Sequence, residues 1–350
     1  MTRPGFFEHL HPPTIAAREA RFGYTFGLGG IAVFLFFVLV VTGVPLMFVY
    51  VPTTAGAAAS IRMITFVAPY GWLLRNAHYW AGQLLVVVAT LHLLRVALTG
   101  AYKGPRRFNW LLGLCLFSVV LLLNFTGYVL RWDADTNWAL TVGVNLVRET
   151  PIVGPWLYGI LVGAAASGSM ASALPGEAAV GRFYTWHVIG LAIPAAGLVA
   201  WHVFRVRRDG GISRRRPAEG EPRAERIQRQ ELLRREGLAM LAVTGLLLLV
   251  SLFFDAPLGA AVDPLAGNEV AQAPWFFLWV QALLRSLSPL LAGVGIPLLV
   301  LATLALLPWL LDKSDIAVAE WFNRPGRWAQ VVVLSLLAAI LSLTLWEMLR

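Results

Sequence analysis

The stretch GWLLRNAHYWAGQLLVVVATLHLLRVALTG, residues 71–100, places two histidines, His78 and His92, within an apolar run long enough to cross a bilayer. The histidines are 14 residues apart. In an α-helix this is nearly four turns, so both side chains face one side, roughly 21 Å apart along the axis. Polar side chains in hydrocarbon are costly and usually mark a function. The stretch therefore predicts a transmembrane helix with a chemical role.

A second apolar run, residues 181–205, repeats this arrangement with His187 and His202, which are 15 residues apart. They again lie on nearly one helical face, roughly 22 Å apart along the axis. One further apolar run separates these two runs, so they cross the bilayer in the same direction. We therefore expect His78 to lie level with His187, and His92 level with His202.

Two imidazoles at one level suit the axial ligation of a haem iron. The pattern predicts two non-covalent b-type haems, one held by His78 and His187 near the outer surface and one by His92 and His202 near the inner surface. Two haems stacked in this way would conduct electrons across the bilayer. Structural histidines are one alternative. Zinc is another, but two histidines without a neighbouring carboxylate or thiolate supply too few ligands.

Glycines repeat at a similar interval in two neighbouring apolar runs. Gly29 and Gly43 are 14 residues apart, and so are Gly113 and Gly127. A missing side chain lets a flat ring approach the backbone, although glycine is also common where membrane helices pack closely. Together with the histidines, the repeat favours space for two macrocycles.

Arginines stand within a few residues of three of these histidines, at Arg75, Arg95 and Arg207. Their guanidinium groups suit the carboxylates of haem propionates. Long basic side chains near the ends of a span also reach lipid headgroups, which is the competing interpretation.

The composition predicts an all-α membrane protein. Of the 350 residues, 58% are hydrophobic and 13% charged, with a mean hydropathy of +0.69, whereas about a quarter of a soluble domain is charged. Seven stretches are long and apolar enough to span a bilayer. They lie near residues 25–50, 74–100, 109–130, 181–205, 237–255, 290–311 and 328–348.

Basic residues predict the orientation of these spans. Arginine and lysine gather in the N-terminal segment and in every second connection, most densely in 209–236. By the positive-inside rule this side is cytoplasmic, so we expect a multi-pass protein of a bacterial inner membrane with a cytoplasmic N-terminus. The first 24 residues lack the apolar core of a cleavable signal. The net charge of +9 is therefore a topology signal, and no nucleic-acid partner is expected.

The connection 209–236 also divides the chain. We expect an N-terminal cytoplasmic segment at 1–24, a four-helix dihaem domain at 25–208, a cytoplasmic linker at 209–236 and a three-helix domain at 237–350. Two further stretches, 137–165 and 274–288, look amphipathic or re-entrant and belong to the outer face.

The chain has one cysteine, Cys115. One cysteine excludes an intrachain disulfide, a cysteine-ligated iron–sulfur cluster and a CxxCH haem attachment within this chain. Because Cys115 lies in an apolar run, we expect a small, buried packing residue.

At this level of detail the chain resembles the cytochrome b/b6 family, and most closely cytochrome b6 and subunit IV fused in one chain. The resemblance rests on residues 71–113, which contain His78 and His92, on TGYVLRWD at 126–133 and on GRFYTWHVIG at 181–190. The 15-residue interval from His187 to His202 is typical of the b6 branch. Spans after residue 237 resemble subunit IV.

The resemblance implies the cytochrome b subunit of a quinol-oxidising complex. Such proteins oxidise quinol at an outer site, pass one electron to a Rieske iron–sulfur protein and a c-type cytochrome, and send the other through both haems to an inner quinone site. The complexes are usually dimeric. By motif matching, the outer quinol site would comprise Tyr128, Trp132, Asp133, Pro274, Trp275 and Phe276.

Three positions depart from the family pattern. Where the family has Pro-Glu-Trp-Tyr, this chain has Ala-Pro-Trp-Phe at 273–276, so the glutamate that receives a quinol proton is absent. Glu269, Asp133 or Asp135 could replace it. Arg131 stands where a proline is usual.

The third departure is Gly27, at the position where the b6 branch often tethers an extra haem through cysteine, so no covalent haem c is expected. The missing glutamate and Arg131 leave a second function open. In this alternative the chain is a dihaem conduit or membrane anchor of another quinone-linked complex, without Rieske bifurcation.

Overall fold

The computed structural model describes residues 14–17, 21–163, 177–211, 225–260, 262 and 272–350. Within these residues seven helices are long and apolar enough to cross a membrane, as the sequence predicts. They are α3 (Leu28–Val49), α5 (Gly71–Leu98), η1 with α6 (Gly104–Arg106, Arg107–Val129), α9 with η2 and α10 (Glu177–Thr185, Trp186–Leu191, Ala192–Arg208), α11 (Arg229–Phe253), η4 with α13 (Leu291–Gly295, Ile296–Leu310) and η5 with α14 (Arg324–Gly326, Arg327–Met348).

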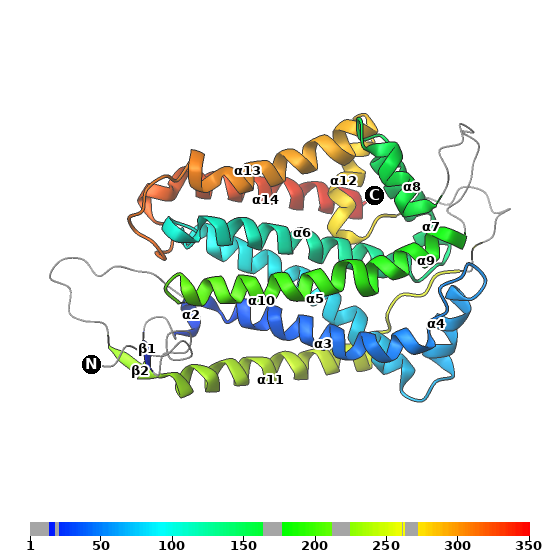
Figure 1. The fold of residues 1–350 in the computed structure, drawn as a ribbon, viewed down its shortest axis with the longest axis horizontal. Helices are drawn as coiled ribbons and strands as arrows, with labels where there is room; N and C mark the ends of the chain where they lie inside the picture. Colours follow the sequence, from blue (N-terminus) through cyan, green and yellow to red (C-terminus); the bar gives the residue numbers. More distant parts are fainter. Residues whose placement is uncertain (1–13, 18–20, 164–176, 212–224, 261, 263–271) are drawn as a thin grey trace.

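The long helices lie side by side, with α13 and α14 on one flank of the molecule and α11 on the other (Figure 1). On the α11 flank, Leu247 packs with Leu35 of α3 and with Ala81 and Leu85 of α5. On the opposite flank, the indole Nε1 of Trp110 in α6 donates to the carbonyl of Leu304 in α13 at 2.8 Å. The helices around the histidines are thus held from both sides.

Short helices gather at one end of the bundle (Figure 1). They are α4 (Ala57–Phe66), α7 (Ala134–Arg148), α8 (Gly154–Val162), η3 (Trp275–Phe277) and α12 (Leu278–Leu284). Two of them, α7 and α8, occupy most of the stretch 137–165, and η3 with α12 falls within 274–288; none is long enough to span a bilayer. The sequence analysis did not predict α4. We call this end the pocket end, because the cavity described in the next subsection opens here.

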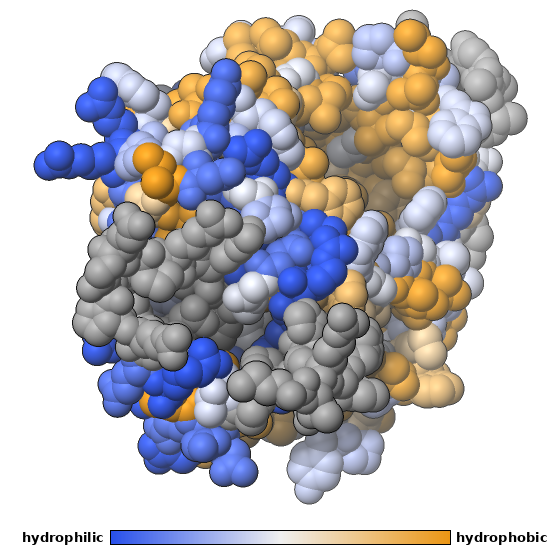
Figure 2. Space-filling model, turned by 60° about the vertical axis from the view of Figure 1, so that its left-hand side comes forward, coloured by the Kyte–Doolittle hydropathy of each residue, from blue (hydrophilic) through white to orange (hydrophobic). Residues whose placement is uncertain are grey.

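The other end carries Arg205, Arg207 and Arg208 at the close of α10, and we call it the arginine-rich end. Here β1 (Thr14–Ala16) pairs antiparallel with β2 (Arg226–Gln228), and Ile15 packs on Leu232. Figure 2 turns this end forward and shows hydrophilic residues on it, while apolar residues cover much of the adjoining flank. An apolar flank between polar ends suits a bilayer.

Two single residues differ from the expectation. Cys115 is exposed on α6 rather than buried. An apolar span looks alike on its lipid side and its protein side, so hydropathy could not assign the face. Conversely Lys103, one of the basic loop residues that mark the orientation, is 1% exposed and ion-paired with Asp312.

Candidate functional site

The four intramembrane histidines form two close pairs. The ring centroids of His78 and His187 are 6.3 Å apart with an interplanar angle of 74°, and those of His92 and His202 are 6.5 Å apart at 82°. Two metal–nitrogen bonds of about 2.0–2.1 Å, with about 1.1 Å from each nitrogen to its ring centre, require a separation of about 6.3 Å. Both pairs therefore have the spacing of two imidazoles on opposite sides of one iron.

A π-helical segment explains why both pairs form despite unequal intervals. His78 and His92 lie on the regular helix α5, whereas His187 lies in the π-helix Trp186–Leu191. A π-turn accommodates one extra residue without turning the rest of the helix. The 15-residue interval therefore spans the same two levels as the 14-residue interval in α5.

Each repeated glycine lies against a different histidine ring. A Cβ at Gly43 would lie 3.0 Å from Cε1 of His78, and one at Gly127 would lie 2.8 Å from Cε1 of His187. At the second level the same construction gives 3.2 Å from Gly29 to His92 and 3.3 Å from Gly113 to His202. These backbones form cradles that a side chain would fill, so the glycines admit the imidazoles directly.

Threonine hydroxyls orient the pair at the pocket end. Oγ1 of Thr42 lies 2.9 Å from Nδ1 of His78, and Oγ1 of Thr126 lies 3.0 Å from Nδ1 of His187. With Nδ1 occupied by a hydrogen bond, Nε2 is the nitrogen left for a metal. Neither threonine was predicted, although each directly precedes a repeated glycine.

Two of the arginines near the histidines, Arg75 and Arg95, have protein partners. Arg75 is buried and donates from Nη1 to the carbonyl of Ala256 at 3.1 Å and from Nη2 to that of Pro257. Arg95 is buried, donates from Nε to the carbonyl of Tyr24 at 3.3 Å and lies over the Tyr24 ring. Arg207 is half-buried near the end of α10. Arg75 thus ties α5 to the segment after α11, a role that its position in the sequence did not suggest.

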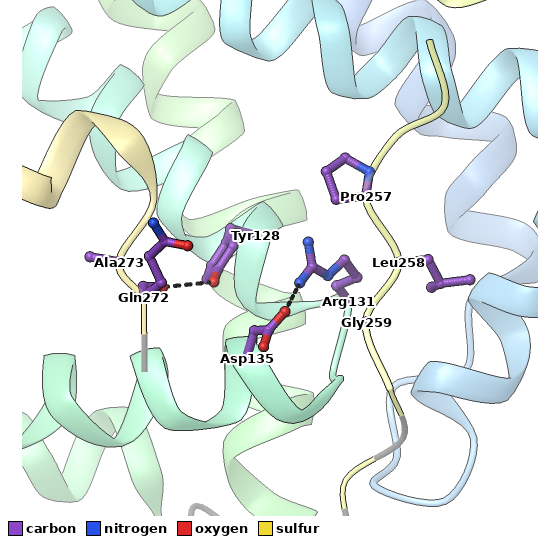
Figure 3. Close-up of a pocket in the computed structure, with 8 residues that line it drawn as sticks. All are labelled: Tyr128, Arg131, Asp135, Pro257, Leu258, Gly259, Gln272 and Ala273. Atoms are coloured by element: carbon purple, nitrogen blue, oxygen red, sulfur yellow. Dashed lines mark hydrogen bonds and ion pairs between the residues drawn. The ribbon is translucent and has the colours of Figure 1, made fainter. Parts of the chain in front are cut away.

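A cavity of about 320 Å³ opens at the pocket end (Figure 3). Its lining comes from three parts of the chain, namely Tyr128, Arg131, Asp135, Pro257, Leu258, Gly259, Gln272 and Ala273. The Tyr128 hydroxyl donates to the carbonyl of Gln272 at 3.2 Å. Arg131 lies over the Tyr128 ring, 5.2 Å from its centroid, and its Nη2 is 3.3 Å from Asp135. The cavity thus places an aromatic ring, a cation and a carboxylate together.

Asp133 is close to this cavity but is fully engaged by the protein. It caps α7, accepting from the amide of Thr136 at 3.1 Å, and it accepts from the amide of Gly259 at 2.8 Å and from the Arg131 guanidinium. Burial opposes its ionisation, but these hydrogen bonds outweigh burial and hold the pKa of the carboxyl below its usual value. Such a carboxylate is a poor proton acceptor.

The remaining predicted residues of the outer site surround the cavity without lining it. Trp132 is buried in the cluster beneath α7. Pro274 caps η3, and Trp275 Nε1 donates to Oε1 of Gln83 at 2.7 Å. The Phe276 ring packs against Trp275. Glu269, the third candidate proton acceptor, lies outside the described residues.

The lining residues Pro257, Leu258, Gly259 and Gln272 were not predicted. No periodicity in the sequence marked their connection. Among the described residues, no group of three or more His, Cys, Asp or Glu could hold a metal ion, and the histidine pairs remain the candidate metal ligands.

Comparisons with known proteins agree with this geometry. Residues 83–261 match the family model of cytochrome b (N-terminal)/b6/petB, and residues 261–348 match that of cytochrome b (C-terminal)/b6/petD. The chain therefore belongs to the cytochrome b/b6 family.

Relatives within the family come from respiratory and b6-type proteins. The menaquinol:cytochrome c reductase cytochrome b subunit of Geobacillus thermodenitrificans is 34% identical over 203 residues, which are 58% of this chain and 85% of that protein. Cytochrome b6 of Heliobacterium modesticaldum (strain ATCC 51547 / Ice1) is 36% identical over 184 residues, or 52% of this chain and 82% of that protein.

A solved structure, titled hyperthermophilic respiratory Complex III, superposes with a TM-score of 0.78. It covers 93% of this chain and 84% of the matched chain at 22% identity. This likeness confirms the fold predicted from the sequence. The chain is a multi-pass membrane protein with a cytochrome b architecture.

Proposed function

We propose that this chain is the dihaem cytochrome b subunit of a quinol-oxidising electron-transfer complex. The observation that carries the proposal is that the histidines form two pairs at two depths, and that the rings of each pair have the separation expected for two imidazole ligands of one iron. His78 and His187 hold one b haem, and His92 and His202 hold the other. Bound haem supplies reversible one-electron chemistry at each level.

The protein's own task is to hold the imidazoles in place. The glycine cradles let the imidazole rings pack against α3 and α6. The π-turn keeps His187 level with His78 while His202 is level with His92. Near-perpendicular ring planes and fixed Nδ1 partners at the pocket end limit rotation of the ligands. A ligand set fixed in advance reduces reorganisation when the charge of the site changes.

The cavity at the pocket end is the proposed quinol site. Its volume is at the lower end of the range for small-molecule sites, and its ring, cation and carboxylate suit a hydroxylated aromatic head group. A quinol that gives up two electrons also releases two protons, and Asp135 takes the first proton. The Asp135 side chain is 54% exposed, so it can pass that proton on to solvent, whereas Asp133 is committed to capping and ion pairing.

The partners follow from the family and from the names of the relatives. We propose a Rieske iron–sulfur protein and a c-type cytochrome as acceptors on the pocket side, and quinone as the second substrate. The complex is a homodimer in a bacterial inner membrane, with the pocket end outside and the N-terminus in the cytoplasm. The arginine content of the connections supports this orientation.

A redox titration of the purified complex tests the core of the proposal. A reduced-minus-oxidised spectrum with a b-type α-band that titrates as two components is the expected result. His78→Ala or His187→Ala removes one component, and His92→Ala or His202→Ala removes the other. Absence of porphyrin iron from the wild-type protein would refute the proposal.

A second measurement addresses bifurcation. With inner-site turnover inhibited, quinol and an added oxidant should drive haem reduction, because the partner takes one electron and the haems receive the other. If haem reduction does not depend on the added oxidant, the alternative function is favoured, in which the chain is a dihaem electron conduit without Rieske bifurcation. Asp135→Asn should slow quinol oxidation, because the amide cannot accept the proton, while Asp135→Glu should retain the activity.

A further inference from the structure

Resting on the proposed function, we infer that Thr42 and Thr126 lower the midpoint potential of the pocket-end haem relative to the other haem. Both act on the iron through the axial histidines, so they are tuning and positioning residues. The two levels differ in one respect. At the pocket end, the two imidazoles have threonine hydroxyls as partners, whereas at the other level a leucine stands at each equivalent position.

The direction of the two hydrogen bonds follows from the threonines themselves. A hydroxyl has one hydrogen. Thr42 donates it to the carbonyl of Val38 at 2.8 Å, and Thr126 donates it to that of Leu123 at 3.1 Å. Each oxygen can therefore only accept from its imidazole. Nδ1–H is then the donor in both histidines, and Nε2 is the nitrogen that would bind the haem iron.

The second level lacks this feature. Thr42 and Thr126 directly precede Gly43 and Gly127, but the residues before Gly29 and Gly113 are leucines, Leu28 and Leu112. Nδ1 of His202 is buried, and within the described part of the chain no side-chain hydroxyl lies within hydrogen-bonding distance of it.

A backbone carbonyl four residues before the glycine lies near the ring at both levels, that of Leu39 or Leu123 at the pocket end and that of Asn109 at the other. Because such a carbonyl is also close to His202, this contact alone does not separate the two levels. The threonine hydroxyl is the group that differs.

The chemical effect of a hydroxyl acceptor is known in sign. Donation from Nδ1–H to an acceptor raises the basicity of the ligating nitrogen. A more basic ligand stabilises the oxidised, more positive iron and lowers its midpoint potential. At the other level, the buried guanidinium of Arg95 close to His92 favours the reduced state. Both effects make electron transfer from the pocket-end haem to the second haem favourable.

The test is a redox titration of the purified complex carrying Thr42→Val, Thr126→Val or both. Valine matches threonine in shape and lacks the acceptor. The pocket-end component should shift to higher potential in each single variant and further in the double variant, while the other component stays in place. Each tenfold change in the ratio of reduced to oxidised haem corresponds to about 59 mV. Thr42→Ser and Thr126→Ser should restore the wild-type potential.

A matched control and a reverse substitution complete the test. Thr90, on the histidine-bearing helix α5, donates its hydroxyl hydrogen to the carbonyl of Val86 at 2.8 Å. Thr90→Val should leave both potentials unchanged. Leu112→Thr adds a hydroxyl beside Gly113 and should lower the potential of the second haem.

Two haems with unchanged potentials in both the valine variants and Leu112→Thr would overturn the inference and leave the proposed function standing. If the valine variants lose haem, Leu112→Thr alone decides the outcome. Absence of haem from the wild-type protein would instead refute the proposed function.

Discussion

Lys103 and Asp312 form an ion pair of 3.0 Å in which both side chains are completely buried. Lys103 follows α5, and Asp312 follows α13, so the pair joins the helices that carry the histidines to those of the second half. Tyr102 donates to the same carboxylate at 2.9 Å, and Lys103 also donates to Oδ1 of Asn323 at 3.1 Å. These bonds supply the partners that a buried charge needs.

Removal of one partner should therefore be costly. Asp312→Ala leaves the Lys103 ammonium buried without its counter-ion, and we expect a loss of about 3–5 kcal/mol of stability. Denaturation of the purified protein, followed by haem absorbance, measures this loss. Asp315→Ala is the control, because its ion pair with Arg107 is largely solvent-exposed and should contribute little. Equal stability of the two variants would contradict the structural role of the buried pair.

The unequal histidine intervals give a prediction about helix phase. Insertion of one alanine between Val86 and Val87 in α5 turns His92 by about 100° relative to His78. We expect this variant to lose one haem. Deletion of Gly190 should convert the π-turn into regular α-helix. Both haems should be retained, because the interval from His187 to His202 becomes 14 residues, as between His78 and His92 in α5. The haem-to-protein ratio of each purified variant measures this. Two haems per chain in the insertion variant would contradict the prediction that ligation depends on the helical phase of His92.

The glycine cradles predict selective haem loss. Gly127→Ala places a Cβ 2.8 Å from the His187 ring, closer than ordinary contact allows. We expect weakened binding of the pocket-end haem, with the other haem kept. Gly197→Ala in α10 is the control, since no described residue lies within 4 Å of its added Cβ. The two components of the α-band report the difference. Equal haem content in both variants would show that the cradle is not needed.

Asp133 predicts a pH dependence of stability. Its pKa is lowered in the folded protein, so its contribution is complete above the unfolded pKa of about 3.9 and is lost as the pH falls through the folded pKa. Asp133→Asn keeps a good helix cap but removes the charge beside Arg131. We expect the variant to be less stable at neutral pH and the difference to shrink below about pH 4. Thermal unfolding across this range measures it, and a constant difference would contradict the charge-based account.

The sequence was most informative where chemistry is periodic. Apolar runs predict the spans, and four histidines at helical intervals within them predict the pairing of rings at two levels. The glycine repeat predicts space for two macrocycles, and in the structure each of these glycines lies against a histidine ring. Nothing comparable marked the cavity lining, because residues 257–259 and Gln272 lie between the predicted spans, where no helical periodicity shows which side chains come together.

Some features required knowledge of partners distant in sequence. The full engagement of the Asp133 carboxylate depends on the distant amide of Gly259 as well as on its local cap, and the burial of Lys103 depends on Asp312. The exposure of Cys115 depends on which side of α6 faces other helices. Hydropathy and spacing contain none of this information, since each is decided by packing between segments far apart in the chain.

The bonds between the two halves make the peptide connection between α10 and α11 dispensable in principle. Asn76 in α5 donates to the carbonyl of Ser251 and to the Asp255 carboxylate at 3.0 Å each, and β2 pairs with β1 near the other end of α11. A chain severed between residues 212 and 224 would keep all of these contacts. Gene fission at that point is therefore compatible with an unchanged assembly, and what the continuous polypeptide guarantees is equal stoichiometry of its two parts.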